Sequence, residues 1–328
     1  MQNPSSRTSP GPDPEPQTKN LLERMQASGM PALCDLPVGQ ARAMLAELSS
    51  RSDIEFIELP EVCDERVPVS GGSIGVRVYR PRPPGTLLPV VILYHGGGFI
   101  IGDLDTHDRM ARYYAREADA VVVSVGYRLA PEHRFPTGVE DCYAALGWIV
   151  AQAGRLGVDA RRIAVTGDSA GGNLSAVVCL LARDRGGPSI RFQALAYPVV
   201  DLTVRADWPS RRDFAAGYFL TARDMDWVTS HYFDDAPVQS RDPRASPLLA
   251  ASLEGLPPAL VVTAGFDPLC DEGRAYAERL AASGVATEHR CFAGTIHGFL
   301  SFAGVLDAGR EGLALVAERM RSALHDQA

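Results

Sequence analysis

The chain has 328 residues, which is enough to bury one large hydrophobic core. Its formal net charge is −8 at pH 7, and its basic residues are 31 arginines and a single lysine, Lys19. An acidic chain offers no basic face to a nucleic acid or an anionic membrane, so we expect neither as a partner. No apolar run approaches the roughly 18 residues of a transmembrane helix, which argues against stable membrane insertion.

Residues 1–18 form a polar, proline-rich tail that we expect to be disordered. The tail has no apolar stretch of the kind that a signal peptide needs, and this predicts a cytoplasmic protein. Six cysteines are scattered without C-x-x-C spacing, so the sequence supports neither a zinc site nor a redox pair. Glycine motifs for dinucleotides or phosphates are missing too, and we expect no cofactor and no metal.

Residues 19–55 space their apolar positions as two helices do, which predicts N-terminal cap helices. The chain then alternates extended runs with helical stretches, a pattern typical of parallel βαβ units. The expected strands are 62–69, 74–80, 88–94, 120–125, 163–166, 192–199, 259–265 and 285–292. We therefore predict a core of residues 56–202 and 239–328, built on a mostly parallel eight-stranded sheet with helices on both faces.

The alternation stops between residues 203 and 238, where we expect a cap insertion. This segment holds seven of the 24 aromatic residues of the chain: Trp208, Phe214, Tyr218, Phe219, Trp227, Tyr232 and Phe233. An aromatic-rich insertion after a strand predicts a lid over a pocket, joined by the N-terminal helices. For the individual aromatics a second interpretation stays open, in which they only pack the insertion's own small core.

The segment Gly167-Asp168-Ser169-Ala170-Gly171 joins an expected strand to an expected helix. A G-x-S-x-G sequence in this position is the pattern of a nucleophile elbow, in which small neighbours let the strand and the helix approach closely. A second match, Gly71 to Gly75, lies between two extended runs, so we interpret Ser73 as a hairpin-turn residue. Ser169 is therefore the predicted nucleophile.

A serine nucleophile needs a base, and the base needs a carboxylate that holds its tautomer. Open α/β sheets bind ligands at the carboxyl ends of their strands, so both partners should follow strands. Of the seven histidines, His297 meets this condition best because it follows the last expected strand. Asp267 directly follows the preceding strand, whereas its rival Asp271 is placed to cap the next helix. The order Ser169, Asp267, His297 is the order expected of an α/β hydrolase.

The segment His95-Gly96-Gly97-Gly98-Phe99 follows the buried strand 88–94. Three successive glycines there let bare backbone N–H groups face a substrate, as acyl transfer requires for its oxyanion. We predict Gly97, Gly98 and Ala170 as the N–H donors of an oxyanion hole. A flexible glycine turn is the weaker alternative, because the run follows this particular strand.

Five ordered blocks together resemble a known family: HGGGF at 95–99, YRLAPEHRFP at 127–136, GDSAGGN at 167–173, DPLCDEG at 267–273 and IHGF at 296–299. They look like the hormone-sensitive-lipase-like bacterial carboxylesterases, family IV of the α/β-hydrolase superfamily. The resemblance implies an α/β-hydrolase fold, the same triad and oxyanion donors, and a cap made from the N-terminal region plus an insertion. It also implies a structural role for residues 127–136. The tail and the cap have no counterpart in these blocks, which therefore leave the substrate undefined.

These residues predict a carboxylesterase that hydrolyses short- to medium-chain carboxylic esters, its small-molecule substrates, through a serine acyl-enzyme. The alternative from another class is a ligand-binding protein like the plant gibberellin receptors, which resemble the family but lack the catalytic histidine. The presence of His297 separates the two hypotheses. Amidase or lactonase activity with the same triad stays open. The last strand, 285–292, is an expected sheet edge that can pair with its copy in a homodimer.

Overall fold

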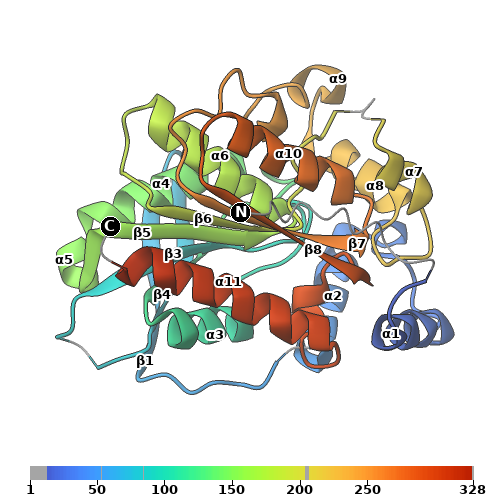
Figure 1. Cartoon of the computed structure of the whole chain (residues 1–328), viewed down its shortest axis with the longest axis horizontal. Coiled ribbons are helices and arrows are strands. Elements are labelled where there is room, and N and C mark those ends of the chain that lie inside the picture. Colours follow the sequence, from blue (N-terminus) through green and yellow to red (C-terminus); the bar gives the residue numbers. More distant parts are fainter. Residues whose placement is uncertain (1–12, 53, 84, 204–206, 327–328) are drawn as a thin grey trace, which may run out of the picture.

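A twisted eight-stranded sheet runs through the centre of the protein (Figure 1). The computed structural model describes residues 13–52, 54–83, 85–203 and 207–326. Its strands are β1 (Glu61–Val69), β2 (Gly72–Arg80), β3 (Leu88–Tyr94), β4 (Val121–Gly126), β5 (Val158–Asp168), β6 (Phe192–Ala196), β7 (Ala259–Phe266) and β8 (Thr287–Ile296). They lie in the order β1-β2-β4-β3-β5-β6-β7-β8. Strand β2 is antiparallel to β1 and β4, and the remaining neighbours are parallel, which confirms the predicted sheet.

Helices cover both faces of this sheet (Figure 1). One face carries α3 (Asp108–Ala118) and α11 (Asp307–His325). The other carries α4 (Thr137–Ala151), the short α5 (Ala153–Leu156), α6 (Ala170–Asp184) and α10 (Cys270–Ala282). None of the described helices combines the length and the apolar character that crossing a bilayer requires.

Strand β3 shows why a continuous apolar run predicts a central strand. All seven of its residues are buried. Val90 and Ile92 pack with the helices of one face, while Val91 and Leu93 pack with those of the other. Burying an aliphatic side chain of this size contributes about 1.5–3 kcal/mol, so alternate positions of one strand stabilise two separate layers.

Most of the predicted cap elements lie near the end of the sheet where the parallel strands finish (Figure 1). From the N-terminal region come α1 (Pro16–Ala27), a 3₁₀ turn η1 (Leu33–Asp35) and α2 (Val38–Ser52). From the insertion come α7 (Pro209–Asp213), α8 (Ala222–Tyr232) and, at its end, α9 (Ala236–Gln239). Two further 3₁₀ turns are η2 (Pro247–Leu249) and η3 (Phe299–Phe302).

The start of α1 corrects the prediction of a disordered tail over residues 1–18. The helix begins at Pro16, a residue type that is favoured at the first helical position because its missing N–H is not needed there. Thr18 is fully buried and its hydroxyl donates to Thr295 Oγ1 at 3.3 Å, while the Glu15 N–H donates to the Gly294 carbonyl at 2.9 Å. These contacts with β8 order residues 15–18. Residues 1–12 of the predicted tail lie outside the described residues.

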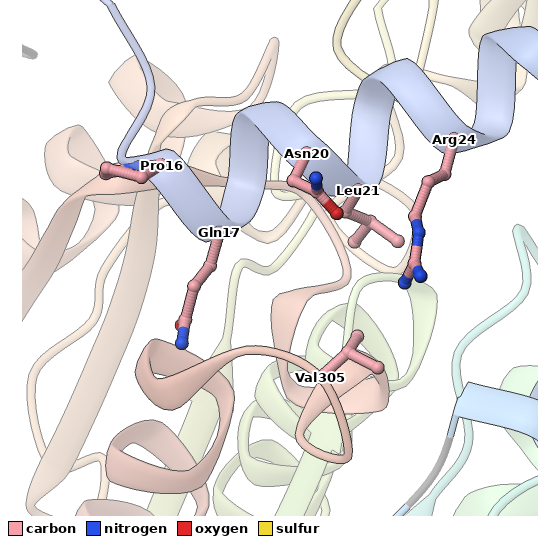
Figure 2. A pocket seen from close by; sticks show the side chains of 6 residues that line it. All are labelled: Pro16, Gln17, Asn20, Leu21, Arg24 and Val305. Atoms are coloured by element: carbon pink, nitrogen blue, oxygen red, sulfur yellow. The ribbon is translucent and has the colours of Figure 1, made fainter.

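A second attachment of α1 lies beside a groove of about 240 Å³ (Figure 2). The groove is lined by Pro16, Gln17, Asn20, Leu21, Arg24 and Val305. Gln17 points from α1 to the start of α11, where its amide donates to Asp307 Oδ2 at 2.9 Å and accepts from the Asp307 N–H at 2.8 Å. One side chain thus joins α1 to the start of α11.

Two of the sequence expectations concern the hairpin near Ser73 and the end of the last strand. Strands β1 and β2 form the expected hairpin, and Ser73 is the second residue of β2, where its hydroxyl accepts from Arg66. Strand β8 continues to Ile296, four residues beyond the expected end at Phe292. The glycine and threonine at 294 and 295 suggested a loop, but Ile296 pairs with Phe266 across an irregularity in the β7–β8 register.

Candidate active site

Ser169 occupies a strained turn between β5 and α6. Its φ of 54° lies in the left-handed region, which costs a non-glycine residue about 1–3 kcal/mol. The turn is held by the Ser169 N–H, which donates to the Ala196 carbonyl at 2.9 Å. A Cβ on Gly171 would collide with the Tyr94 carbonyl oxygen, so the second glycine of the motif is required by the close approach of α6 to β3.

His297 and Asp267 meet Ser169 from the ends of two neighbouring strands. His297 follows β8 directly, and its Nε2 lies 3.0 Å from Ser169 Oγ. Its Nδ1 donates to Asp267 Oδ2 at 2.8 Å, and Asp267, which follows β7, is fully buried. This pairing keeps the proton on Nδ1 and leaves Nε2 free to accept the serine proton. The structure therefore brings together the three residues that the sequence singled out.

The rival carboxylate, Asp271, makes different contacts. Its Oδ2 accepts the Ser210 N–H at 2.8 Å and its Oδ1 accepts from Arg274 at 2.7 Å. Ser210 belongs to the insertion, and its hydroxyl also donates to the Pro268 carbonyl at 2.8 Å. Asp271 thus anchors the insertion to the segment that follows Asp267.

The glycine loop after β3 faces Ser169 with unoccupied donors. Gly97 and Gly98 have φ of 113° and 60°, and the Gly97 carbonyl accepts the N–H groups of Ile100 and Ile101. Within the described part of the chain, no acceptor is found for the N–H of Gly97 or of Gly98. Ala170 is the first residue of α6, so its N–H lies at the positive end of the helix dipole and has no intrahelical acceptor.

A buried carboxylate that the sequence reasoning missed supports this loop. Asp168 Oδ1 accepts the Gly96 N–H at 3.0 Å and lies 3.0 Å from His107 Nε2. Burial alone would raise the pKa of Asp168, but the charge of His107 and hydrogen bonds from His107 and Gly96 hold it below its ordinary value. The loop is held further by His95, whose Nδ1 donates to the Gly96 carbonyl at 2.8 Å. Burial lowers the pKa of His95 to about 4, so this ring is neutral at pH 7.

Ser169, His297 and the glycine loop line a cavity of about 1000 Å³. Its walls come from α1, α2 and α8 and include Lys19, Leu22, Met44, Leu45, Leu48, Met225, Trp227 and Val228. A Cβ on Gly98 would lie 2.5 Å from Val228, and one on Gly298 would lie 3.2 Å from Phe219. The insertion therefore contacts both the glycine loop and the residue that follows His297. No cluster of three potential metal ligands occurs among the described residues.

Comparisons with known proteins agree on one superfamily. A family model described as the alpha/beta hydrolase fold matches residues 91–301. The carboxylic ester hydrolase LipN of Mycobacterium tuberculosis is 50% identical over 74% of this chain and 65% of its own length. The carboxylesterase NlhH of the same organism is 42% identical over 96% of this chain and 97% of its own. The solved ester hydrolase EH1AB1, from the metagenome of Lake Arreo, has a TM-score of 0.89 at 43% identity and covers 94% of this chain and 98% of its own.

The buried pair of Asp168 and His107 predicts a pH-dependent contribution to stability. Replacing Asp168 by Asn removes the buried carboxylate that faces His107 and the Gly96 N–H, so we expect the free energy of unfolding to fall by about 3 kcal/mol at pH 7. Because the pKa of Asp168 is lowered by folding, its contribution is complete above its ordinary value of 3.8 and decreases as the pH falls below it. Urea unfolding of the wild type and of the Asp168→Asn variant at pH 7 and pH 3 measures this difference in the free energy of unfolding.

The matched control is Asp105→Asn, because Asp105 pairs with Arg77 on the surface with 79% of its side chain exposed. An exposed pair contributes little to stability, so this variant should unfold like the wild type at both pH values. An equal loss in the two variants at pH 7 would contradict the assigned role of Asp168.

Proposed function

We propose that this chain, which belongs to the hormone-sensitive-lipase-like carboxylesterases of the α/β-hydrolase superfamily, hydrolyses carboxylic esters through a serine acyl-enzyme. One observation carries the proposal. A continuous hydrogen-bond chain runs from Ser169 Oγ through His297 to the buried Asp267, with distances of 3.0 and 2.8 Å. A serine with this support and with donors for an oxyanion beside it has what acyl transfer requires.

In the first half-reaction Ser169 Oγ attacks the ester carbonyl carbon while His297 Nε2 takes its proton. Asp267 stabilises the imidazolium that forms and holds the ring in place. The N–H groups of Gly97, Gly98 and Ala170 receive the negative charge that develops on the carbonyl oxygen. His297 then protonates the departing alcohol, which leaves the acyl group on Ser169.

In the second half-reaction water replaces the alcohol. His297 takes a proton from the water molecule, the resulting hydroxide attacks the acyl carbon, and the same three N–H groups hold the second oxyanion. Ser169 recovers its proton from His297 as the carboxylic acid leaves. No metal and no organic cofactor enters this scheme, since every proton moves between groups already in place.

The cavity supports esters of short to medium chain length as substrates. Its volume of about 1000 Å³ exceeds what a very small ester fills, and its walls carry the aliphatic and thioether side chains of Met44, Leu48, Met225 and Val228. Such walls favour apolar acyl or alcohol groups. A non-catalytic receptor is the contrasting function, and the 3.0 Å contact of His297 with Ser169 argues against it. Amidase or lactonase activity would need the same groups, and no observation favours either.

Replacing Ser169 by Ala is expected to lower the kcat for a short-chain nitrophenyl ester by about 10⁴-fold or more, because the acyl-enzyme cannot form. A fluorophosphonate probe should label the wild type at Ser169 and leave the variant unlabelled. Ser73→Ala is the matched control, since Ser73 lies in the second G-x-S-x-G sequence, within the β1–β2 hairpin. Full activity in a folded Ser169→Ala protein would refute the proposal.

Gly97→Ala tests the glycine loop. A Cβ at this position would collide with the Ile101 carbonyl oxygen, so the loop must move. Its N–H groups then no longer point at the carbonyl oxygen of the ester. We expect kcat to fall by about 10²- to 10³-fold with a smaller change in KM, as for the loss of an oxyanion donor. Gly284→Ala is the control, because Gly284 also has a positive φ but has open space around it. It should lower stability by about 1 kcal/mol and leave kcat unchanged.

We also propose that the chain forms a homodimer through its edge strand. The prediction gave this edge as Val285 to Phe292, and β8 is the last strand of the sheet. The C-terminal end of β8 is covered by the segment before α1, because the Gly294 carbonyl accepts the Glu15 N–H. Residues 287–292 of the same strand remain available to pair with a second copy of the chain. Light scattering should give the mass of two chains, and amide exchange at 287–292 should slow as the protein concentration rises. A single-chain mass at all concentrations would rule out the dimer.

Cytoplasmic localisation is the last part of the proposal. All six cysteines are free thiols, as is usual in a reducing compartment. Cell fractionation with an antibody to the chain tests it, and recovery from the exported fraction would contradict it.

A further inference from the structure

Two cysteines that lie 21 positions apart in sequence come together next to the segment that contains Asp267. Cys270 is the first residue of α10, and its N–H donates to the Asp267 carbonyl at 3.0 Å. Cys291 lies in β8, six residues before His297. Both side chains are partly exposed. The C-x-x-C rule could not predict this pair, because the fold rather than local spacing joins its members.

The β7–β8 register and the packing of α10 explain how the two cysteines meet. Cys291 pairs with Thr263 of β7, and residues opposite each other on neighbouring strands point to the same face of the sheet. That face is covered by α10, because a Cβ on Gly273 would lie 2.8 Å from Cγ2 of Thr263. Cys270 precedes Gly273 by three residues and therefore lies on the same side of the helix. The strand register and the helix packing thus place the two cysteines beside each other, between β8 and the first turn of α10.

Their surroundings make the two thiols chemically different. The neighbouring Cys270 thiol lowers the pKa of Cys291 against the effect of burial, and Thr263 and the charge of Arg274 act in the same direction. The Cys291 thiol, together with burial, raises the pKa of Cys270. Of the two thiols, Cys291 is thus the one that ionises more readily and is the better candidate for the attacking thiolate.

The other four cysteines provide the contrast. Burial raises the pKa of Cys34, Cys63, Cys142 and Cys179. Cys142 and Cys179 are fully buried, whereas Cys34 and Cys63 are as accessible as the pair. Accessibility alone therefore does not distinguish Cys291, but its combination with a thiolate and a neighbouring thiol does.

We propose that Cys270 and Cys291 form a peroxide-sensitive dithiol, a modification site in which Cys291 is the attacking thiolate and Cys270 the resolving thiol. The Cys291 sulfur attacks hydrogen peroxide, the O–O bond breaks, and the departing hydroxide takes up a proton to give water and a sulfenic acid. The Cys270 sulfur then attacks the sulfenic sulfur, and a second water leaves. Two thiols and one peroxide thus give one disulfide and two water molecules. This site does not depend on the proposed ester hydrolysis.

The sequence makes the product easy to detect. Cleavage after arginine releases residues 245–274 with Cys270 as their only cysteine and residues 291–310 with Cys291 as theirs. The full-length protein is treated with one equivalent of hydrogen peroxide, blocked with N-ethylmaleimide and digested without reductant. We expect the two peptides as one species, two hydrogen masses below their sum, which dithiothreitol separates. Recovery of both peptides as maleimide adducts in the wild type would overturn the proposal.

Three variants test the two roles. Cys270→Ser should give no linked peptide and leave a sulfenic acid at residue 291 that dimedone traps, whereas Cys291→Ser should leave Cys270 unoxidised. Cys63→Ser is the matched control, because Cys63 is equally accessible, and it should give the linked peptide as the wild type does. At pH 7 the oxidation of Cys291 should be about fivefold faster than that of Cys63, since its larger thiolate fraction outweighs its lower intrinsic nucleophilicity. Equal rates would contradict the assigned difference.

Discussion

The close approach of α6 to the end of β3 is the constraint on which the site depends. Because Gly171 lacks a side chain, the first turn of α6 packs directly against the Tyr94 carbonyl. This contact places the serine turn next to the glycine loop that follows β3. Asp168, one residue before Ser169, then reaches the Gly96 N–H at 3.0 Å. The strand order, in which β3 and β5 are neighbours, makes the serine turn and the glycine loop a single unit.

The cap is attached to the same unit at several points. Asn173, one turn after Ser169, is fully buried and donates to the carbonyls of Val199 and Ala245 at 2.8 and 2.7 Å. These two carbonyls lie just before and just after the insertion. Within the insertion, Tyr232 stacks on Phe99 of the glycine loop with ring centroids 4.1 Å apart. The two ends of the insertion are therefore held by α6, the helix that begins directly after Ser169.

Sequence patterns predicted the elements whose signal lies in residues that are neighbours in the sequence. A continuous apolar run identified β3, and the glycine-flanked serine identified the turn before α6. The start of α1 was missed because prolines near a chain end resemble a disordered tail, whereas contacts with β8 order this segment. His107 and Asp168 were missed for a different reason. Their pairing joins residues 61 positions apart and leaves no periodic signal.

The aromatic residues of the insertion have different environments that their sequence does not distinguish. Composition alone could not separate those that line the cavity from those that pack internally. Phe219 and Trp227 line it. Phe214 and Tyr218 pack on each other and on Phe266, at ring distances of 5.3 to 5.5 Å. The aromatics thus divide between the cavity wall and packing, and the packing group contacts Phe266 of β7 and not only other residues of the insertion.

The single lysine of the chain has a practical consequence. Lys19 is exposed on α1 and lines the rim of the cavity. Amine-reactive reagents therefore have one side-chain target in the sequence, and it lies at the cavity. Attachment to a solid support through the Lys19 side chain would hold the molecule with the cavity toward the surface. A polarity-sensitive fluorophore coupled to Lys19 would instead report on molecules that enter the cavity.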